Sequence, residues 1–282
     1  MGKILVTGAS GNVGREVVQS LLSKGAQVKS AVFNFKSELD QSGEEKVLFD
    51  FADSKTYGPA FEGVDQLFLM RPPQISDVKK YLFPIIDFAL EQGVRQITFL
   101  SLQGVQFNIF TPHFKVEKYL RKLRAPFTFI RPNFYMQNLV TFYKEDIRER
   151  SEIFLPAGNG RMAFVDVRDV GEISAKILIK DGHLGNAYTV SGPESLNYIQ
   201  VASILSDVIG KTVNFANPSV KEYVKRMRDQ GADEEFINVQ KMLYFVVRHN
   251  FSASPQSDAE TLLGRKPRCL LQFAEDYRRS WV

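Results

Sequence analysis

A glycine-rich loop near residue 8 constrains the fold more than any other feature of this sequence. It follows the apolar run at 3–7 and precedes a segment whose apolar residues recur on one helical face, so it marks a strand–turn–helix unit. In the spacing G-x-x-G-x-x-G, the first glycine permits a tight turn, the second lets backbone N–H groups approach a pyrophosphate, and the third lets the helix pack close to the sheet. An ordinary glycine turn is the alternative. The context favours a dinucleotide site with its phosphates at the N-terminal end of the helix. Seven residues are assigned to this site: Gly8, Ala9, Ser10, Gly11, Asn12, Val13 and Gly14.

Short apolar runs alternate with helical patterns through the first 180 residues. After the run at 3–7, the predicted strands are 27–32, 47–51, 66–70, 96–100 and 127–131, and the predicted helices include 81–92 and 113–123. These strands are apolar without alternation, which is typical of a parallel sheet that is buried on both faces. Right-handed crossovers then give an α/β fold with a doubly wound parallel sheet.

The pattern changes after Pro132. We predict a helix over 133–150, a short strand over 151–155 and a helix over 167–180, followed by irregular helices with few strands.

We therefore expect two parts. Residues 1–155, completed by part of 156–182, are expected to form the dinucleotide-binding core. Residues 183–282 are expected to form a smaller mixed α/β lobe that binds the substrate, with 133–155 contributing to the cleft.

The residues after the second and third strands bear on the choice of cofactor. A carboxylate at the end of the second strand would favour NAD, but this strand is followed by Phe33 and Lys36. We predict that NADP(H) is preferred through Lys36, with NAD(H) as the alternative, and that Phe33 stacks on the adenine. Asp50 either accepts a hydrogen bond from the adenine amino group or is a simple helix-cap or turn aspartate, and Phe51 is assigned to the same site.

Composition argues against several other classes of function. The 282 residues are 44% hydrophobic, and no stretch approaches the ~20 apolar residues that a membrane span needs. Cys269 is the one cysteine, and the three histidines lack metal-ligand spacing, so we expect neither a disulfide nor a metal site. The net charge is +4, and the basic stretch at 221–228 is interpreted as a solvated helix face. We expect a cytoplasmic protein without a membrane or nucleic-acid partner.

Several motifs together resemble the NmrA-like group of atypical short-chain dehydrogenases, which includes quinone, azo-dye and triphenylmethane reductases. The resemblance covers nearly the whole chain. Besides the glycine loop, it rests on Phe99–Ser101 with Gly104, His113–Glu117, Thr128–Asn138, Pro156–Arg161, Phe164–Val170 and Leu262–Arg265. It implies a Rossmann core and a small C-terminal lobe, with the active site in the cleft between them.

The resemblance also brings a departure from the usual chemistry. Ordinary short-chain dehydrogenases carry a tyrosine acid and, four residues later, a lysine on the helix after the fifth strand. The matching positions here are His113 and Glu117, which we assign as catalytic. With a pKa of ~6.5, His113 can supply a proton near neutral pH, as can solvent, and Glu117 can hydrogen-bond it from one turn below. The alternatives are a capping histidine and a solvated glutamate.

The remaining candidate residues follow strands. Arg71 either reaches a phosphate or lies on the surface, and Ser101 is placed toward the nicotinamide ribose. Phe134, Tyr135 and Asn138 are assigned to the substrate, since aromatic rings can sandwich a planar molecule. Packing between the two parts is the alternative for the aromatic residues.

Two functions stay open from the sequence. The first is an NAD(P)H-dependent oxidoreductase that passes hydride to a planar, electron-poor small molecule such as a quinone, whose reduced anion needs little proton assistance. The second is a non-catalytic NAD(P)-binding redox sensor with a regulatory protein partner, as the resemblance also allows. We favour the enzyme because a substantial lobe follows the core. A homodimer is compatible with either.

Overall fold

The computed structural model describes residues 2–33, 44–255 and 257–282, so Lys36 lies outside the described residues. The chain divides into two compact units. Unit 1 comprises residues 1–132, 167–190 and 258–265. Unit 2 comprises residues 133–166, 191–257 and 266–282.

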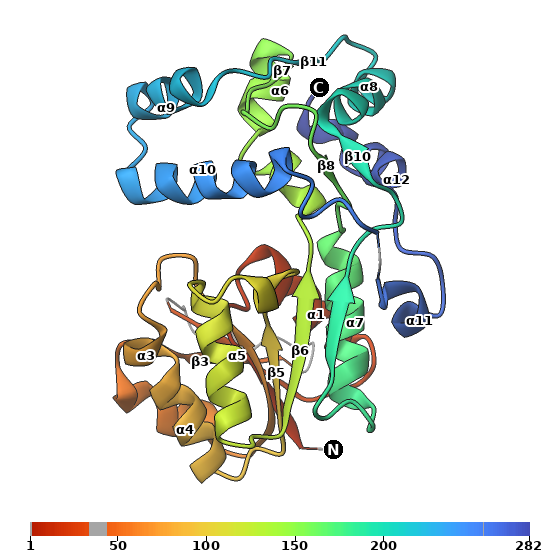
Figure 1. Cartoon of the computed structure of the whole chain (residues 1–282). Coiled ribbons are helices and arrows are strands. Elements are labelled where there is room, and N and C mark those ends of the chain that lie inside the picture. Colours follow the sequence, from red (N-terminus) through yellow and green to blue (C-terminus); the bar gives the residue numbers. More distant parts are fainter. Residues whose placement is uncertain (1, 34–43, 256) are drawn as a thin grey trace. The chain divides into compact units, whose positions relative to one another are not determined.

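Unit 1 is built around a parallel sheet, whose strands in the described residues have the order β3-β2-β1-β4-β5-β6-β9 (Figure 1). Their bounds are β1 (Lys3–Val6), β2 (Val28–Val32), β3 (Glu44–Leu48), β4 (Val64–Met70), β5 (Gln96–Leu100), β6 (Phe127–Pro132) and β9 (Ala187–Val190). The chain is wound outward from β1 to β2 and β3, and then returns to add β4 and the later strands on the other side. This is the doubly wound arrangement, so the predicted α/β fold class is confirmed.

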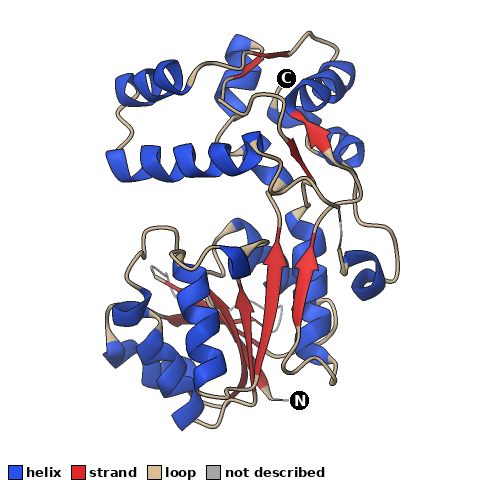
Figure 2. Ribbon diagram, viewed as in Figure 1, coloured by secondary structure: helices blue, strands red, loops and turns tan. Residues whose placement is uncertain are grey.

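Helices cover both faces of this sheet (Figure 2). On one face, α1 (Asn12–Leu22) packs against α7 (Val167–Ile179), and a Cβ on Gly171 would lie only 2.6 Å from the Cβ of Glu16. On the other face, helices share one buried cluster with Leu67, Phe99 and Phe129 of the strands. These helices are α2 (Tyr57–Phe61), α3 (Val78–Tyr81), α4 (Phe83–Glu91) and α5 (Pro112–Lys122).

Unit 2 combines helices with two small sheets. Its helices are α6 (Lys144–Arg150), α8 (Tyr198–Ile209), α9 (Val220–Asp229), α10 (Glu234–Arg248) and α12 (Leu270–Asp276). β8 (Arg161–Met162) pairs antiparallel with β10 (Leu196–Asn197), and β7 (Glu152–Ile153) pairs parallel with β11 (Asn214–Phe215). Trp281 is buried in the core of this unit, where its indole N–H donates to the carbonyl of Leu139 at 2.9 Å.

The prediction of one helix over 133–150 is wrong. The chain is extended at Tyr135, which forms a single parallel bridge with Val165, and helical structure begins only at Met136. The N–H of Val165 donates to the carbonyl of Phe134 at 2.8 Å, and the N–H of Met136 donates to the carbonyl of Val165 at 2.9 Å. These long-range bonds replace the local bonds of a continuous helix, and a periodic pattern carries no information about them.

The two units divide the chain differently from the predicted parts. β9 pairs with β6 in unit 1, whereas the sequence places residues 183–282 in the lobe. Only one of its four residues is fully buried, so no apolar run marks this strand. Residues 258–265 also belong to unit 1, where α11 (Ala259–Leu263) packs on α7, and residues 133–155 belong to unit 2.

Candidate functional site

Topology brings several candidate residues of unit 1 to one edge of its sheet. β4 lies between β1 and β5, and the carboxyl ends of parallel strands meet at the same edge. The glycine loop follows β1, Arg71 follows β4 and Ser101 follows β5. The order of the strands reverses between β1 and β4, and ligands of open α/β sheets bind at such a switch point.

The glycine loop makes the close backbone approach that its spacing predicts. Gly8 has a φ of +65°, in the left-handed region that favours glycine, and its carbonyl accepts the N–H of Gly11 at 2.9 Å. A Cβ on Gly14 would lie 2.1 Å from the same carbonyl oxygen, so α1 approaches the turn this closely only with glycine there. A Cβ on Gly11 would lie 3.3 Å from that oxygen, a distance that needs only a small adjustment.

The N-terminus of α1 presents backbone donors. Gly11 is the N-cap residue, and no side chain of the described residues caps the first turn, which also contains no acidic residue. The first N–H groups of a helix have no partner within it, and the macrodipole adds partial positive charge at this end. These donors beside the turn at Gly8 fit the pyrophosphate of a dinucleotide.

Strand β4 holds the start of the loop in place. The hydroxyl of Thr7 donates to the carbonyl of Phe68 at 3.1 Å and accepts the N–H of Met70 at 2.8 Å. The side chain of Met70 covers Gly8, since a Cβ on Gly8 would lie 2.1 Å from its Cε. This role of Thr7 was not predicted, although a hydroxyl at the end of an apolar, buried strand signals that it needs a partner.

Of the residues expected near the adenine, Asp50 lies in a turn and Phe33 has a solvent-exposed ring. Phe33, directly after β2, is 65% exposed, which leaves its ring open for stacking. A carboxylate oxygen of Asp50 accepts the N–H of Ala52 at 2.8 Å, and this is the turn role that the sequence left open. Phe51 is half-buried and packs against the core of unit 1. Contact of these residues with an adenine stays a prediction.

Arg71 is directed toward its own loop. Its Nη1 donates to the carbonyls of Pro72, Pro73 and Ile75 at 2.7–3.0 Å, and its Nε is buried without a hydrogen-bond partner among the described residues. Burial lowers the pKa of this guanidinium. Arg71 therefore fixes the loop after β4, and its contact with a phosphate stays a prediction.

His113 lies in the first turn of α5, with its ring 6.0 Å from the ring of Phe99. Burial, with a contribution from the charge of Arg71, lowers the pKa of His113 from 6.5 to about 3. The imidazole is therefore neutral at pH 7. In this state it can make hydrogen bonds, but it has no proton that it releases near neutral pH. This argues against His113 as the proton donor and favours solvent.

Glu117 lies at the centre of a buried network of three side chains. It accepts the hydroxyl proton of Ser101 at 2.7 Å and two N–H groups of Arg131, from Nε at 2.9 Å and from Nη2 at 2.5 Å. Glu117 and Ser101 are each 4% exposed. Both sequence interpretations of Glu117 are wrong, because it is buried and its partners are Ser101 and Arg131 rather than His113. The role of Arg131 was missed, although a charge in an apolar strand signals a buried partner.

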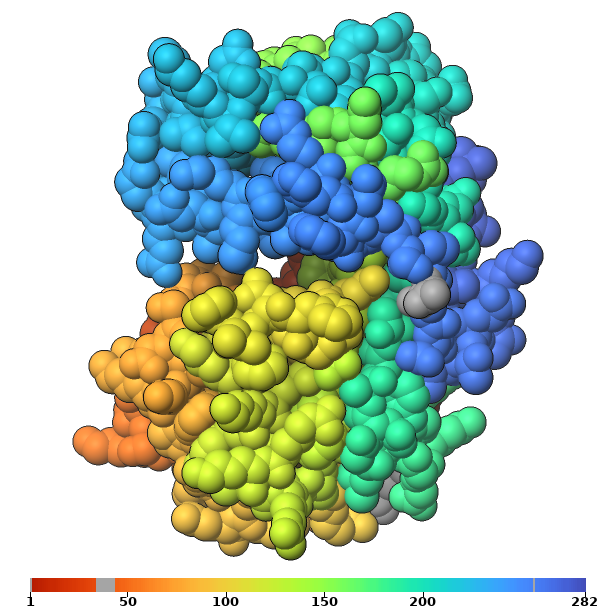
Figure 3. Space-filling model, viewed as in Figure 1, coloured from red at the N-terminus to blue at the C-terminus, as the bar shows by residue number. Residues whose placement is uncertain are grey.

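The segment between β5 and α5, drawn in yellow in Figure 3, lies on the surface of unit 1. It carries three exposed apolar side chains that the sequence analysis did not assign to a site. Phe107 is 86% exposed, Ile109 57% and Phe110 83%. Several large apolar side chains in water on one short segment indicate a surface that binds something apolar.

Phe134, Tyr135 and Asn138 lie close together in unit 2. The N–H of Phe134 donates to the side chain of Asn133 at 2.7 Å, and its ring is half-buried against the core of the unit. Burial raises the pKa of the Tyr135 phenol. The N–H of Asn138 donates to the carbonyl of Tyr135 at 3.2 Å. Their contact with a substrate stays a prediction.

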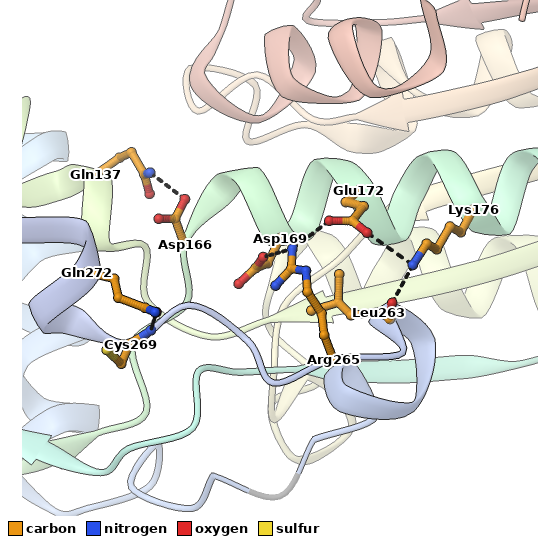
Figure 4. A network of polar contacts seen from close by, with 9 residues as sticks. All are labelled: Gln137, Asp166, Asp169, Glu172, Lys176, Leu263, Arg265, Cys269 and Gln272. Atoms are coloured by element: carbon orange, nitrogen blue, oxygen red, sulfur yellow. Dashed lines mark hydrogen bonds and ion pairs between the residues drawn. The ribbon is translucent and has the colours of Figure 1, made fainter. Parts of the chain in front are cut away.

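Charged contacts fasten residues 258–265 to α7 in unit 1 (Figure 4). Arg265 donates to the fully buried Asp169 at 2.8 Å and to Glu172 at 2.5 Å. Lys176 pairs with Glu172 at 3.0 Å and donates to the carbonyl of Leu263 at 2.5 Å. The two motifs that contain Asp169 and Arg265 thus meet in a structural network.

Two structural features are absent from the ranges 2–33, 44–255 and 257–282. None of their helices is long and apolar enough to cross a bilayer. No group of three or more His, Cys, Asp or Glu side chains in these ranges is arranged to hold a metal ion.

Comparisons with known proteins agree with this architecture. The sequence profile of the NmrA-like family matches residues 1–270. The NAD(P)H azoreductase of Xenophilus azovorans is 28% identical over 287 residues, and the match covers 99% of each chain.

Solved structures extend the comparison. The triphenylmethane reductase of Citrobacter sp., complexed with NADP(H), matches with a TM-score of 0.85 at 25% identity, over 98% of this chain and 99% of that one. The NADPH-dependent quinone oxidoreductase of Escherichia coli, complexed with NADPH, has a TM-score of 0.85 at 21% identity, over 97% and 99% of the chains. At that identity the second likeness concerns the fold alone.

Proposed function

The chain belongs to the NmrA-like family, and from this premise we propose that it is an NAD(P)H-dependent oxidoreductase that passes hydride to a planar, electron-poor acceptor such as a quinone. The family match over residues 1–270 confirms the resemblance that the sequence motifs predict. Relatives whose names include NAD(P)H azoreductase and triphenylmethane reductase support the reductase class. Azo dyes and triphenylmethane dyes are themselves planar or conjugated acceptors.

The observation that carries the cofactor is the fit between the glycine loop and α1. Gly14 has no room for a Cβ beside the carbonyl of Gly8, and the N-terminal N–H groups of α1 are free of a side-chain cap in the described residues. A phosphate bound there accepts these N–H groups and lies at the positive end of the helix dipole. The NADP(H) in the triphenylmethane reductase structure, which is 25% identical, supports NADP(H) as the preferred form.

The cofactor, when bound, supplies the hydride. The chain's own residues bind and orient the cofactor and the acceptor. The α1 amides hold the phosphates, Phe33 offers its ring to the adenine, and Ser101 is assigned to the nicotinamide riboside. The apolar side chains of Phe107, Ile109 and Phe110 fit an apolar, planar acceptor.

Proton supply narrows the class of acceptor. The position of the usual tyrosine acid is His113, whose pKa of about 3 leaves it neutral at pH 7, and the position of the usual lysine is a carboxylate paired with Arg131. Loss of a well-placed general acid costs ~10²–10⁴ in rate. An acceptor whose reduced anion is already stable does not need that acid, so solvent protonates the product.

A panel of acceptors tests this proposal. NADPH oxidation by the purified protein is followed with quinones, azo dyes, simple ketones and aldehydes, without added flavin or metal. We expect turnover with the conjugated acceptors and rates lower by about 10² or more with the simple carbonyls. Equal rates with both groups would contradict the proposed acceptor class. Tight NADPH binding with no oxidation of any acceptor would overturn the enzyme and favour the redox sensor.

A further inference from the structure

The buried network at the end of β5 has a direct consequence for the cofactor. We propose that Glu117 is a positioning residue that makes the Ser101 hydroxyl a hydrogen-bond acceptor for the nicotinamide riboside half of the dinucleotide. This inference rests on the proposed function and names a role within the same site.

Ser101 has one hydroxyl proton, and that proton is donated to Oε1 of Glu117 at 2.7 Å. The N–H of Ser101 donates to the carbonyl of Ile130 at 2.8 Å, which fixes the residue between the carboxyl ends of β5 and β6. A hydroxyl whose proton is committed offers a ligand only its lone pairs. Ser101 therefore selects a ligand group that donates, either a ribose hydroxyl or the carboxamide N–H.

Arg131 keeps Glu117 in this orientation. The guanidinium holds both carboxylate oxygens in a two-pronged contact, and such bidentate pairs are among the most directional hydrogen bonds in proteins. Oε1 accepts from Ser101 and from Nε of Arg131 together. Turning the carboxylate away from Ser101 would break the contact with Arg131 in a buried setting, which is costly. A lysine at position 117 could only donate hydrogen bonds, whereas the carboxylate of Glu117 accepts the hydroxyl proton of Ser101 and thereby orients it.

Three ligands of decreasing size test the assignment of Ser101 by calorimetry. NADPH carries the whole nicotinamide riboside, 2′-phospho-ADP-ribose keeps the ribose hydroxyls without the ring, and adenosine 2′,5′-bisphosphate lacks both. We expect Ser101→Ala to weaken NADPH binding about 5- to 10-fold, as loss of one hydrogen bond does, and to leave the bisphosphate unchanged. A matching loss with 2′-phospho-ADP-ribose assigns the donor to the ribose, and a loss confined to NADPH assigns it to the carboxamide. Unchanged NADPH affinity would overturn the inference.

A double-mutant cycle tests the role of Glu117. In Glu117→Gln, an amide oxygen at the Oε2 position keeps the contact with Nη2 of Arg131, and the amide nitrogen at the Oε1 position donates to Ser101 at the expense of the contact with Nε. The serine proton is then released and turns toward the ligand. We expect this variant to lose the same NADPH affinity as Ser101→Ala, and the double variant to lose no more than either. A purely structural Glu117 would instead weaken all three ligands and add to the effect of Ser101→Ala.

Two controls keep the outcomes separate. Should Glu117→Gln fail to fold, the variant with both Glu117→Met and Arg131→Met removes both charges together and leaves the Ser101 proton without its acceptor, so adding Ser101→Ala to it should cost less NADPH affinity than Ser101→Ala costs the wild-type protein. Failure of the wild-type protein to bind NADPH would overturn the proposed function itself. Normal wild-type binding with additive losses in the cycle would overturn only the role of Glu117.

Discussion

Gly14, the third glycine of the loop, lets α1 lie close enough to the turn to form an anion-binding site at the carboxyl edge of the sheet. Gly14 brings α1 against the carbonyl of Gly8, and this contact directs the first N–H groups of the helix at the turn. At Gly11 the space is larger, so a side chain there is tolerated by the backbone but occupies the region where a phosphate is expected. A substitution at Gly14 is therefore expected to disturb the packing of α1, whereas a substitution at Gly11 is expected to disturb phosphate binding.

A carboxylate at Gly11 tests the phosphate site directly. Gly11→Asp places negative charge at the N-cap of α1, which satisfies the helix and repels a phosphate. We expect NADPH affinity to fall at least 100-fold, on the order of 3 kcal/mol, while thermal stability stays near that of wild type. Gly11→Ala is the matched control, because its Cβ enters the same region without charge, and it should lose clearly less affinity than Gly11→Asp. Equal loss in both variants would mean that the effect is steric.

The neutral state of His113 predicts a specific dependence of stability on pH. Its pKa is about 3 in the folded protein and near 6.5 when unfolded, so between these values the unfolded chain binds the extra proton. The stabilisation is fully present above pH 6.5 and is lost as the pH falls toward 3. In His113→Gln, we expect the drop in unfolding free energy between pH 7 and pH 4 to be smaller by about 2 kcal/mol, as measured by urea denaturation. The same drop in both proteins would show that the pKa of His113 is not lowered in the folded protein.

Individual elements were predictable where local pattern determines them. The strand predicted at 96–100 is β5 itself, and the helix predicted at 113–123 is α5 to within one residue at each end. β3 begins three residues earlier than predicted, because this edge strand carries exposed charged residues and lacks an apolar run.

Features that depend on long-range partners were not predictable. β9 and the extended segment at Tyr135 are fixed by hydrogen bonds to distant strands, and a periodic pattern does not encode these. The same distinction between local and long-range contacts decides which parts of the candidate site could be predicted. The glycine loop is local and was predicted, whereas the pairing of Glu117 with Arg131 and the lowered pKa of His113 arise only when separate elements meet.

The segment at 258–265 depends on its charged contacts with α7. Arg265→Met removes one charged partner of the buried Asp169, and because Arg265 is partly exposed we expect a loss of only about 1–2 kcal/mol in unfolding free energy. Arg95→Met is the matched control, since its pair with Asp65 at 3.1 Å is exposed, and it should change stability by less than about 0.5 kcal/mol. Urea denaturation of both variants measures the difference, and equal effects would rule out a structural role for the network.

At the scale of the whole molecule, the protein is expected to discriminate between NADPH and NADH. The sequence has no carboxylate directly after β2 and has a lysine at position 36, so NADPH is expected to bind more tightly than NADH. Lys36→Ala should reduce this preference by weakening NADPH alone, about 5- to 10-fold for loss of a charged contact. Calorimetry with both cofactors checks it, and a preference for NADH that the substitution leaves unchanged would remove the assignment of Lys36.

The most direct test of the central claim compares NADPH oxidation by a small quinone in the wild-type protein and in Gly11→Asp. If the glycine loop holds the cofactor from which hydride passes to the acceptor, the wild-type protein oxidises NADPH in a quinone-dependent reaction. The variant, still folded, should then lose about 99% of that rate when both proteins are assayed at an NADPH concentration well below the wild-type KM, in line with a ~100-fold loss of affinity. Quinone-dependent oxidation at equal rates in both proteins would contradict the assignment of the loop, and no oxidation by a wild-type protein saturated with NADPH would contradict the reductase itself.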